Sequence, residues 1–290
     1  MAEQMQSIQR RIKSIGSTER ITNAMKLVSA AKLRKAKSAF ESSKLYLGRL
    51  LESIQETLDD VEDVPQRFLT GSREVRKKCY VLITSSNGLC GSFNGNVIRT
   101  MTEKLSEYTN DYSNVRMVTI GSKGREYFAH HGVEILMEHD APADTVTFEE
   151  TREISGPLME LYTKGEIDEI DIVYTSYVNT LKQEVIVKKL LPIDIHSKGE
   201  QGGYTNPIEY GPSAEEVFSY LIPKYIELMI FSTCIESATC EYAARRTAME
   251  NANDNAKDML ADLQLEYNHA RQSEITDEII EIVAGSEAQR

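Results

Sequence analysis

Two glycine-rich segments of the sequence have the composition of ligand-binding loops. Residues 85–91 (SSNGLCG) and residues 121–124 (GSKG) each follow a short apolar run. An open α/β sheet binds ligands beyond the carboxyl ends of its strands, so both segments are candidates for a phosphate site. Neither has the GxxxxGK[ST] pattern of a phosphate-binding loop. We therefore interpret residues 121–124 as a tight strand-to-helix turn that resembles a phosphate cradle only loosely.

The cysteines and histidines lack the spacing of a catalytic or metal site. Cys90 would need a base within hydrogen-bond reach to act as a nucleophile, and no histidine is near it in the sequence. The four cysteines show neither CxxC nor Cys/His spacing, which is typical of reduced thiols in a cytosolic protein. His130 and His131 are adjacent, and His196 and His269 are isolated. The sequence therefore predicts no catalytic residue, no cofactor and no metal on this chain.

The charge of the chain is negative overall but unevenly distributed. The formal net charge of −12 argues against general nucleic-acid binding. Residues 1–57 nevertheless hold eleven basic and five acidic side chains, whereas residues 213–284 hold fourteen acidic and five basic ones. Opposite charge at the two ends favours their pairing, although two separately solvated faces would give the same counts. No apolar run approaches the ~20 residues of a membrane span, so direct membrane insertion is not expected.

Both ends of the chain have the pattern of long helices. Residues 213–284 contain one proline, Pro223, and no glycine, and residues 5–58 continue a similar rhythm past Gly16 and Gly48. Spacings of three, four or their sums indicate a coiled-coil seam. The seam positions are expected at Ile8, Ile12, Ile15, Thr22, Met25, Ser29, Leu33, Ala36 and Phe40, and at Leu221, Tyr225, Leu228, Ile235, Tyr242, Met249, Ala252, Ala256, Met259, Leu263 and Ala270. Because many of these side chains are small, the coil should be thin and housed inside something larger.

The middle of the chain alternates strands with helices. Strands are predicted over residues 79–84, 115–120, 133–136, 167–177 and 184–191, and helices over 94–108, 125–131 and 148–162. The last strand alternates in polarity and is expected to be antiparallel. The predicted fold class is therefore α/β: a long antiparallel coiled coil of the N- and C-terminal helices with an inserted Rossmann-like mixed α/β domain. The expected domain bounds are 1–58, 74–192 and 213–286.

Three stretches together resemble the gamma subunit of the rotary F-type ATP synthase, of bacterial type. They are residues 12–34 (IKSIGSTERITNAMKLVSAAKLR), residues 88–94 (GLCGSFN) and residues 267–285 (YNHARQSEITDEIIEIVAG). The resemblance spans the chain in order and implies a central-stalk rotor that couples ion-driven rotation of the membrane ring to ATP synthesis or hydrolysis in a catalytic hexamer. The sequence departs from the family pattern at Ser85-Ser86-Asn87, where charged residues are usual, and at His269, where arginine is common.

The resemblance also implies partners and contact residues. The implied partners are the alpha and beta subunits of the hexamer, an epsilon-type subunit and the membrane c-ring, with the chain on the cytoplasmic side of the cell membrane as a peripheral protein. Met25 and Arg245 match the coupling region, and Arg271, Gln272, Thr276 and Glu278 match polar contacts to the catalytic subunits. Lys26, Lys32, Arg34 and Lys35 form a basic face for acidic loops, and Tyr204 and Tyr210 lie by the ring-facing foot.

Two other function classes remain open from the residues alone. One is a stand-alone nucleotide- or phosphate-binding α/β protein with coiled-coil arms. The other is a coiled-coil scaffold without motion. ATP binding by the isolated chain would favour the first, and an absence of rotation under ATP would favour the second.

Overall fold

A computed structural model describes residues 2–61, 68, 75–108, 111–140, 142–180, 182–193, 210, 211 and 213–287. The chain forms two compact units, Met1–Ala30 with Arg245–Arg290, and Ala31–Ala244. The two long helices, α1 (Ala2–Asp60) and α5 (Ala214–Glu287), each contribute to both units. The domain bounds expected from the sequence stay a prediction, because the compact units divide these helices rather than separate them from the sheet.

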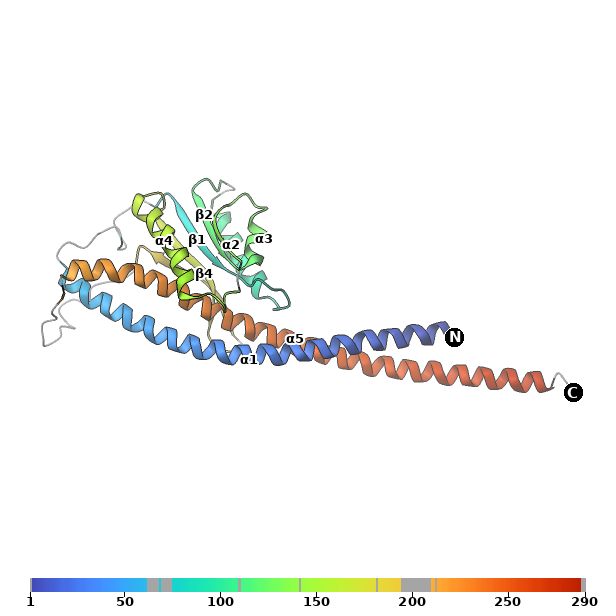
Figure 1. The fold of residues 1–290 in the computed structure, drawn as a ribbon. Helices are drawn as coiled ribbons and strands as arrows, with labels where there is room; N and C mark the ends of the chain where they lie inside the picture. Colours follow the sequence, from blue (N-terminus) through green and yellow to red (C-terminus); the bar gives the residue numbers. More distant parts are fainter. Residues whose placement is uncertain are drawn as a thin grey trace. The chain divides into compact units, whose positions relative to one another are not determined.

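A five-stranded sheet lies in the unit Ala31–Ala244 (Figure 1). Its strands are β1 (Lys78–Ile83), β2 (Val115–Ile120), β3 (Glu134–His139), β4 (Glu169–Tyr177) and β5 (Gln183–Leu191), in the order β3-β2-β1-β4-β5. The first four strands are parallel, and β5 pairs antiparallel with β4. The mixed sheet, with β5 antiparallel, confirms the expectation from the alternating sequence of β5.

The side chains of the central strand β1 are buried on both faces of the sheet. Its side chains alternate between two apolar clusters: Cys79, Val81 and Ile83 join the core that includes α4 and α5, whereas Tyr80 and Leu82 join the core that includes α2 and α3. A parallel sheet buried on both faces needs such a continuous apolar run.

The three shorter helices follow the strands. They are α2 (Phe93–Ser106), α3 (Ser122–Phe128) and α4 (Phe148–Lys164). A capping box between Thr147 and Glu150 starts α4, and Gly165 in the left-handed conformation ends it. The predicted start of α3 at Arg125 is wrong by three residues, because the helix begins directly after Gly121 and includes most of the glycine-rich segment.

The long helices run antiparallel in each unit. In the unit Ala31–Ala244, the hydroxyl oxygens of Ser43 and Ser232 lie 3.2 Å apart. In the other unit, Gln9 donates a hydrogen bond to the Tyr267 hydroxyl at 2.8 Å. A helix of 74 residues, the length of α5, extends about 110 Å at ~1.5 Å per residue. Together with the mixed sheet, the antiparallel pair confirms the predicted fold class.

The expected seam is confirmed along α1 and is wrong at one position of α5. Every predicted seam side chain of α1 is buried or half-buried. On α5, Met259 is 49% exposed, so it faces away from α1. The seam instead includes Asn253, which is fully buried and was not predicted. A regular spacing rule selects apolar residues and therefore passes over a buried amide.

Candidate interaction surface

The glycine-rich segment 121–124 packs tightly against the end of β1. A Cβ atom on Gly121 would lie 2.1 Å from the Thr84 carbonyl oxygen, and the φ of Gly121 is +95°. The Thr84 hydroxyl donates to the Gly121 carbonyl at 3.2 Å and accepts from the Gly124 N–H at 2.9 Å. The two glycines therefore allow a close approach of backbone to backbone, which is the tight turn that the sequence suggested.

Groups of the protein itself occupy the amino end of α3. The Ser122 N–H donates to the Ser86 hydroxyl at 3.3 Å, and the Lys123 N–H donates to the Ser85 carbonyl at 3.2 Å. Phosphate loops bind their ligand through backbone N–H groups of this kind. Since these donors already have protein partners, the segment offers no phosphate cradle.

Helix α5 covers the carboxyl end of β4, at the point where a doubly wound sheet opens a ligand crevice. The Glu236 carboxylate accepts hydrogen bonds from the Ser176 hydroxyl at 2.7 Å and from the Tyr177 N–H at 2.9 Å. The Cys240 thiol donates to the Thr175 carbonyl at 3.4 Å. Helix α5 therefore occupies the space beyond this end of β4 and is attached to the sheet there by these hydrogen bonds.

The four cysteines are buried thiols. All four are free and buried, and the Asn94 side-chain amide donates to the Cys90 sulfur at 3.3 Å. Burial raises the pKa of the Cys79 and Cys234 thiols to about 12, so both stay protonated at neutral pH. The interpretation of Cys90 as a buried thiol is confirmed.

The coil in the unit Met1–Ala30 with Arg245–Arg290 is fixed in register by polar contacts. The Asn253 side-chain amide donates to the Glu19 carbonyl at 2.9 Å and to the Glu19 carboxylate at 3.2 Å. Two turns further along α1, Lys26 lies 4.0 Å from Glu250. A single buried asparagine in a coiled coil specifies pairing register at some cost in stability.

The two predicted coupling residues lie in this same unit, one on each helix. Met25 is half-buried on α1, and Arg245 is 7% exposed on α5. Because Lys26 faces Glu250 and the helices are antiparallel, Met25 is level with residue 251, and Arg245 lies about 9 Å from that level toward the amino end of α5, at ~1.5 Å per residue. The coupling role of both residues stays a prediction.

The last turns of α5 expose a surface of mixed character, the α5 end. The predicted contact residues Arg271, Gln272, Thr276 and Glu278 are all exposed. Within the described residues, the only side-chain hydrogen bond among these four runs from the Thr276 hydroxyl to the Gln272 carbonyl, at 2.8 Å. Large apolar side chains are exposed beside and beyond them, namely Ile275, Ile279, Ile280, Ile282 and Val283. The sequence analysis selected the polar residues and missed these apolar ones, although exposed apolar side chains that cluster on a surface are a signal of interaction.

The predicted basic face is divided by the structure. Lys26 interacts with Glu250, and Lys32 hydrogen-bonds to Tyr242 and lies 3.4 Å from Asp144. Arg34 and Lys35 are exposed and have no hydrogen bond or ion pair in the described part of the chain. Only these last two are therefore available as uncompensated charges.

The predicted foot is described only in part. Tyr204 lies outside the described residues. Tyr210 is half-buried and packs against the larger apolar core. Its role at the foot stays a prediction.

The long helix α5 also contains a window that is long and apolar enough to cross a membrane, judged by length and composition alone. The sequence analysis did not expect such a window. Of this window, 61% is buried inside the protein, as in the core helix of a soluble protein, so it is weak evidence for a span.

Comparisons with known proteins cover nearly the whole chain. A family model described as ATP synthase matches residues 4–289. The ATP synthase gamma chain of Alkaliphilus metalliredigens is 42% identical over 290 residues and covers 98% of each chain. The sodium-ion-specific ATP synthase gamma chain of Acetobacterium woodii is 37% identical and covers 99% of each chain.

Two solved structures share the fold. A chain of the Euglena gracilis mitochondrial ATP synthase, solved with its F1 part and c-ring, has a TM-score of 0.68 at 16% identity and covers 100% of this chain and 95% of that one. A chain from the central stalk and c-ring of the Tetrahymena thermophila mitochondrial ATP synthase has a TM-score of 0.58 at 21% identity, and the match covers 80% of this chain and 99% of that one.

Proposed function

The chain belongs to the family of ATP synthase gamma chains, and from this premise we propose that it is the central-stalk rotor of an F-type ATP synthase. The observation that carries the proposal is the α5 end, where exposed apolar and polar side chains alternate around one helix. A surface of this kind needs a partner that surrounds it. The alpha and beta subunits of a catalytic hexamer are that partner.

The mechanism follows from a helix pair that is stiff and asymmetric. The α1–α5 coil is thin because its seam uses small side chains such as Ser29 and Ala256. When the coil turns, the α5 end presents different side chains to each catalytic subunit in succession. Each subunit is then held in a different conformation by differential contact, which couples rotation to ATP synthesis or hydrolysis.

The sheet serves as a body through which torque reaches the coil. Its joint to α5 at Glu236 connects the sheet to the same helix that carries the α5 end. We assign the c-ring and an epsilon-type subunit as partners of the unit Ala31–Ala244. As a subunit of a membrane-bound complex, the chain is peripheral to the membrane, on its cytoplasmic side.

A rotation assay tests the proposal directly. A cysteine at Lys123, which is partly exposed on α3, would carry a bead on the chain assembled with immobilised alpha and beta subunits. Native cysteines would compete little for the label, since all four are buried. We expect stepwise rotation of the bead on addition of ATP and none with a non-hydrolysable analogue. ATP hydrolysis by the same complex without rotation would overturn the rotor assignment and favour a static scaffold.

A further inference from the structure

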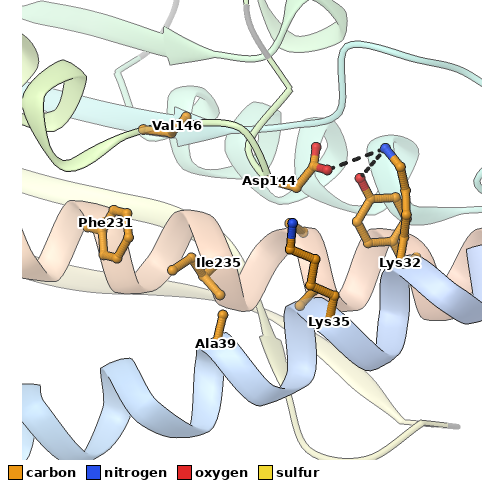
Figure 2. Close-up of a pocket in the computed structure, with 10 residues that line it drawn as sticks. Lys32, Lys35, Ala39, Asp144, Val146, Phe231 and Ile235 are labelled. Atoms are coloured by element: carbon orange, nitrogen blue, oxygen red, sulfur yellow. Dashed lines mark hydrogen bonds and ion pairs between the residues drawn. The ribbon is translucent and has the colours of Figure 1, made fainter.

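A cavity of about 320 Å³ opens in the unit Ala31–Ala244, between α1, α5 and the segment that joins β3 to α4 (Figure 2). The helices leave this space because alanines stand where they face each other: Ala36 and Ala39 on α1 and Ala238 on α5. Residues three apart lie on the same face of a helix. Because both are alanines here, their side chains leave the space between the helices unfilled. The cavity is therefore a result of the sequence, and no part of the proposed rotor mechanism uses it.

The walls of the cavity are apolar and partly aromatic. Phe231 and Ile235 lie along α5, and Val146 covers them from the β3–α4 segment (Figure 2). The Tyr242 ring closes one side. Walls of this kind bury an apolar ligand and pair well with an aromatic ring, because ring edges and faces attract.

The mouth of the cavity carries an excess of positive charge. The Lys32 ammonium lies 3.4 Å from the Asp144 carboxylate and donates to the Tyr242 hydroxyl at 3.1 Å, so its charge is compensated (Figure 2). Lys35, one turn away on α1, also lines the cavity and has no hydrogen bond or ion pair among the described residues. The mouth thus has two cations for one anion.

We propose that this cavity binds a small aromatic carboxylate, with its ring against the apolar wall formed by Ile235 and Ala238 of α5 and its carboxylate beside the Lys35 ammonium. A neutral aromatic ligand would leave the Lys35 charge without a counter-ion. A phosphate dianion would need several converging donors, and the lining residues offer two lysines and the Tyr242 hydroxyl, of which Lys32 is already paired with Asp144. Ligand cavities span roughly 300–1,000 Å³, so this one suits a ligand of one or two rings.

The test measures binding of naphthoate to the purified full-length chain by titration calorimetry. Ala39→Leu fills the cavity from its exposed side, and Lys35→Gln removes the proposed counter-charge. Lys13→Gln is the matched control, since Lys13 is an exposed lysine of the same helix without a described partner and is not among the residues that line the cavity. Naphthol, which is uncharged at neutral pH, serves as the control ligand.

We expect saturable binding of naphthoate to the native chain and to Lys13→Gln. We expect it to weaken about fivefold to tenfold in Lys35→Gln, which is the effect of about one partly solvated charge-assisted hydrogen bond. It should be lost in Ala39→Leu. If that variant does not fold, as judged by circular dichroism, Lys35→Glu provides the second test, because reversal of a surface charge should abolish binding without filling the core.

Three results would overturn the proposal. The first is an absence of saturable binding to the native chain at millimolar naphthoate. The second is native-like binding by a folded Ala39→Leu or Lys35→Glu variant. The third is equal affinity for naphthol and naphthoate, which would show that the cavity does not recognise the carboxylate.

Discussion

The side-chain amide of Asn253 donates to the backbone carbonyl of Glu19 at 2.9 Å, across the seam between α5 and α1. Asn253 is fully buried, and its own side-chain oxygen has no hydrogen-bond partner among the described residues. A buried amide that is satisfied on only one side stabilises one register more than it stabilises the fold.

Replacement of Asn253 by leucine should therefore raise stability and loosen the register. We expect the free energy of unfolding to increase by about 1 kcal/mol, because the half-satisfied amide is replaced by an apolar group. Cysteine pairs report the register: one pair at positions 26 and 250, which are in register, and one pair at positions 26 and 257, two turns away. Cross-linking of the second pair should rise in Asn253→Leu. Cross-links confined to the first pair would contradict the assigned role.

Glu236 should prove to be the main polar attachment of the sheet to α5. Glu236→Ala leaves the Ser176 hydroxyl and the Tyr177 N–H without their acceptor, so we expect a loss of about 2 kcal/mol in urea unfolding. Asp258→Ala is the matched control, because Asp258 is an exposed acid of the same helix without a described partner. Equal stability of the two variants would show that the hydrogen bonds of Glu236 to β4 contribute nothing to the free energy of unfolding.

Gly121 should be intolerant of any side chain. Gly121→Ala would overlap the Thr84 carbonyl and strain a φ of +95°, so we expect a loss of at least about 3 kcal/mol or failure to fold. Gly132→Ala separates the two causes, since Gly132 also has a positive φ, of +74°, but no atom within 4 Å of the added Cβ. Its cost should be only about 1 kcal/mol, from backbone strain alone. Similar melting temperatures for both variants would remove the steric explanation.

The Glu169 carboxylate should make stability depend on acid pH. It is buried between the ammonium groups of Lys78, at 2.5 Å, and Lys189, at 2.8 Å. Burial alone would raise the pKa of Glu169, but the hydrogen bonds from both lysines hold that pKa below its ordinary value of 4.5. The stabilisation is therefore fully present above about pH 4.5 and is lost as the pH falls below that value.

Glu169→Gln tests this dependence. The variant should lose about 2 kcal/mol at pH 7, and its deficit relative to the native chain should shrink between pH 5 and pH 3. Burial and the neighbouring Glu169 charge raise the pKa of Asp171, so Asp171 contributes with the opposite sign, and in the variant only the effect of burial remains. Urea unfolding at several pH values measures the difference. A deficit that does not change with pH would mean that packing, and not charge, stabilises this corner.

Removal of the α5 end should impair rotor function but leave the sheet-containing unit folded. A chain truncated after Arg271 lacks the exposed apolar side chains from Ile275 to Val283 but retains the whole unit Ala31–Ala244. We expect native-like circular dichroism and thermal unfolding of the sheet, with weaker assembly or lower torque on the catalytic hexamer. An unchanged rotation rate and load dependence would show that these exposed side chains are only solvated.

The elements that follow from local pattern were predictable from the sequence. The apolar run of β1 and the alternating polarity of β5 predicted the positions of these strands to within a residue or two. This works because the faces of a strand that are buried carry apolar side chains. The start of α3 was not predictable, because glycines normally indicate a turn, and only the contact with Thr84 shows that Gly124 lies inside the helix.

Partners distant in the sequence could not be predicted. The ion pair of Lys32 with Asp144 joins residues 112 positions apart, and no local rule identifies it. The apolar residues of the α5 end were visible in the sequence, but only their exposure shows that they differ from seam residues such as Leu263.

The passage of α1 and α5 through both compact units has a consequence for biosynthesis. The first thirty residues leave the ribosome more than two hundred residues before Arg245, which begins the α5 part of the same unit. At ~5–20 residues per second, this interval lasts on the order of 10–40 s. Throughout it, Ile8 and the other seam side chains of early α1 have no α5 to cover them. The nascent chain therefore displays an apolar helical stripe during most of its own synthesis, and this unit is the last to fold.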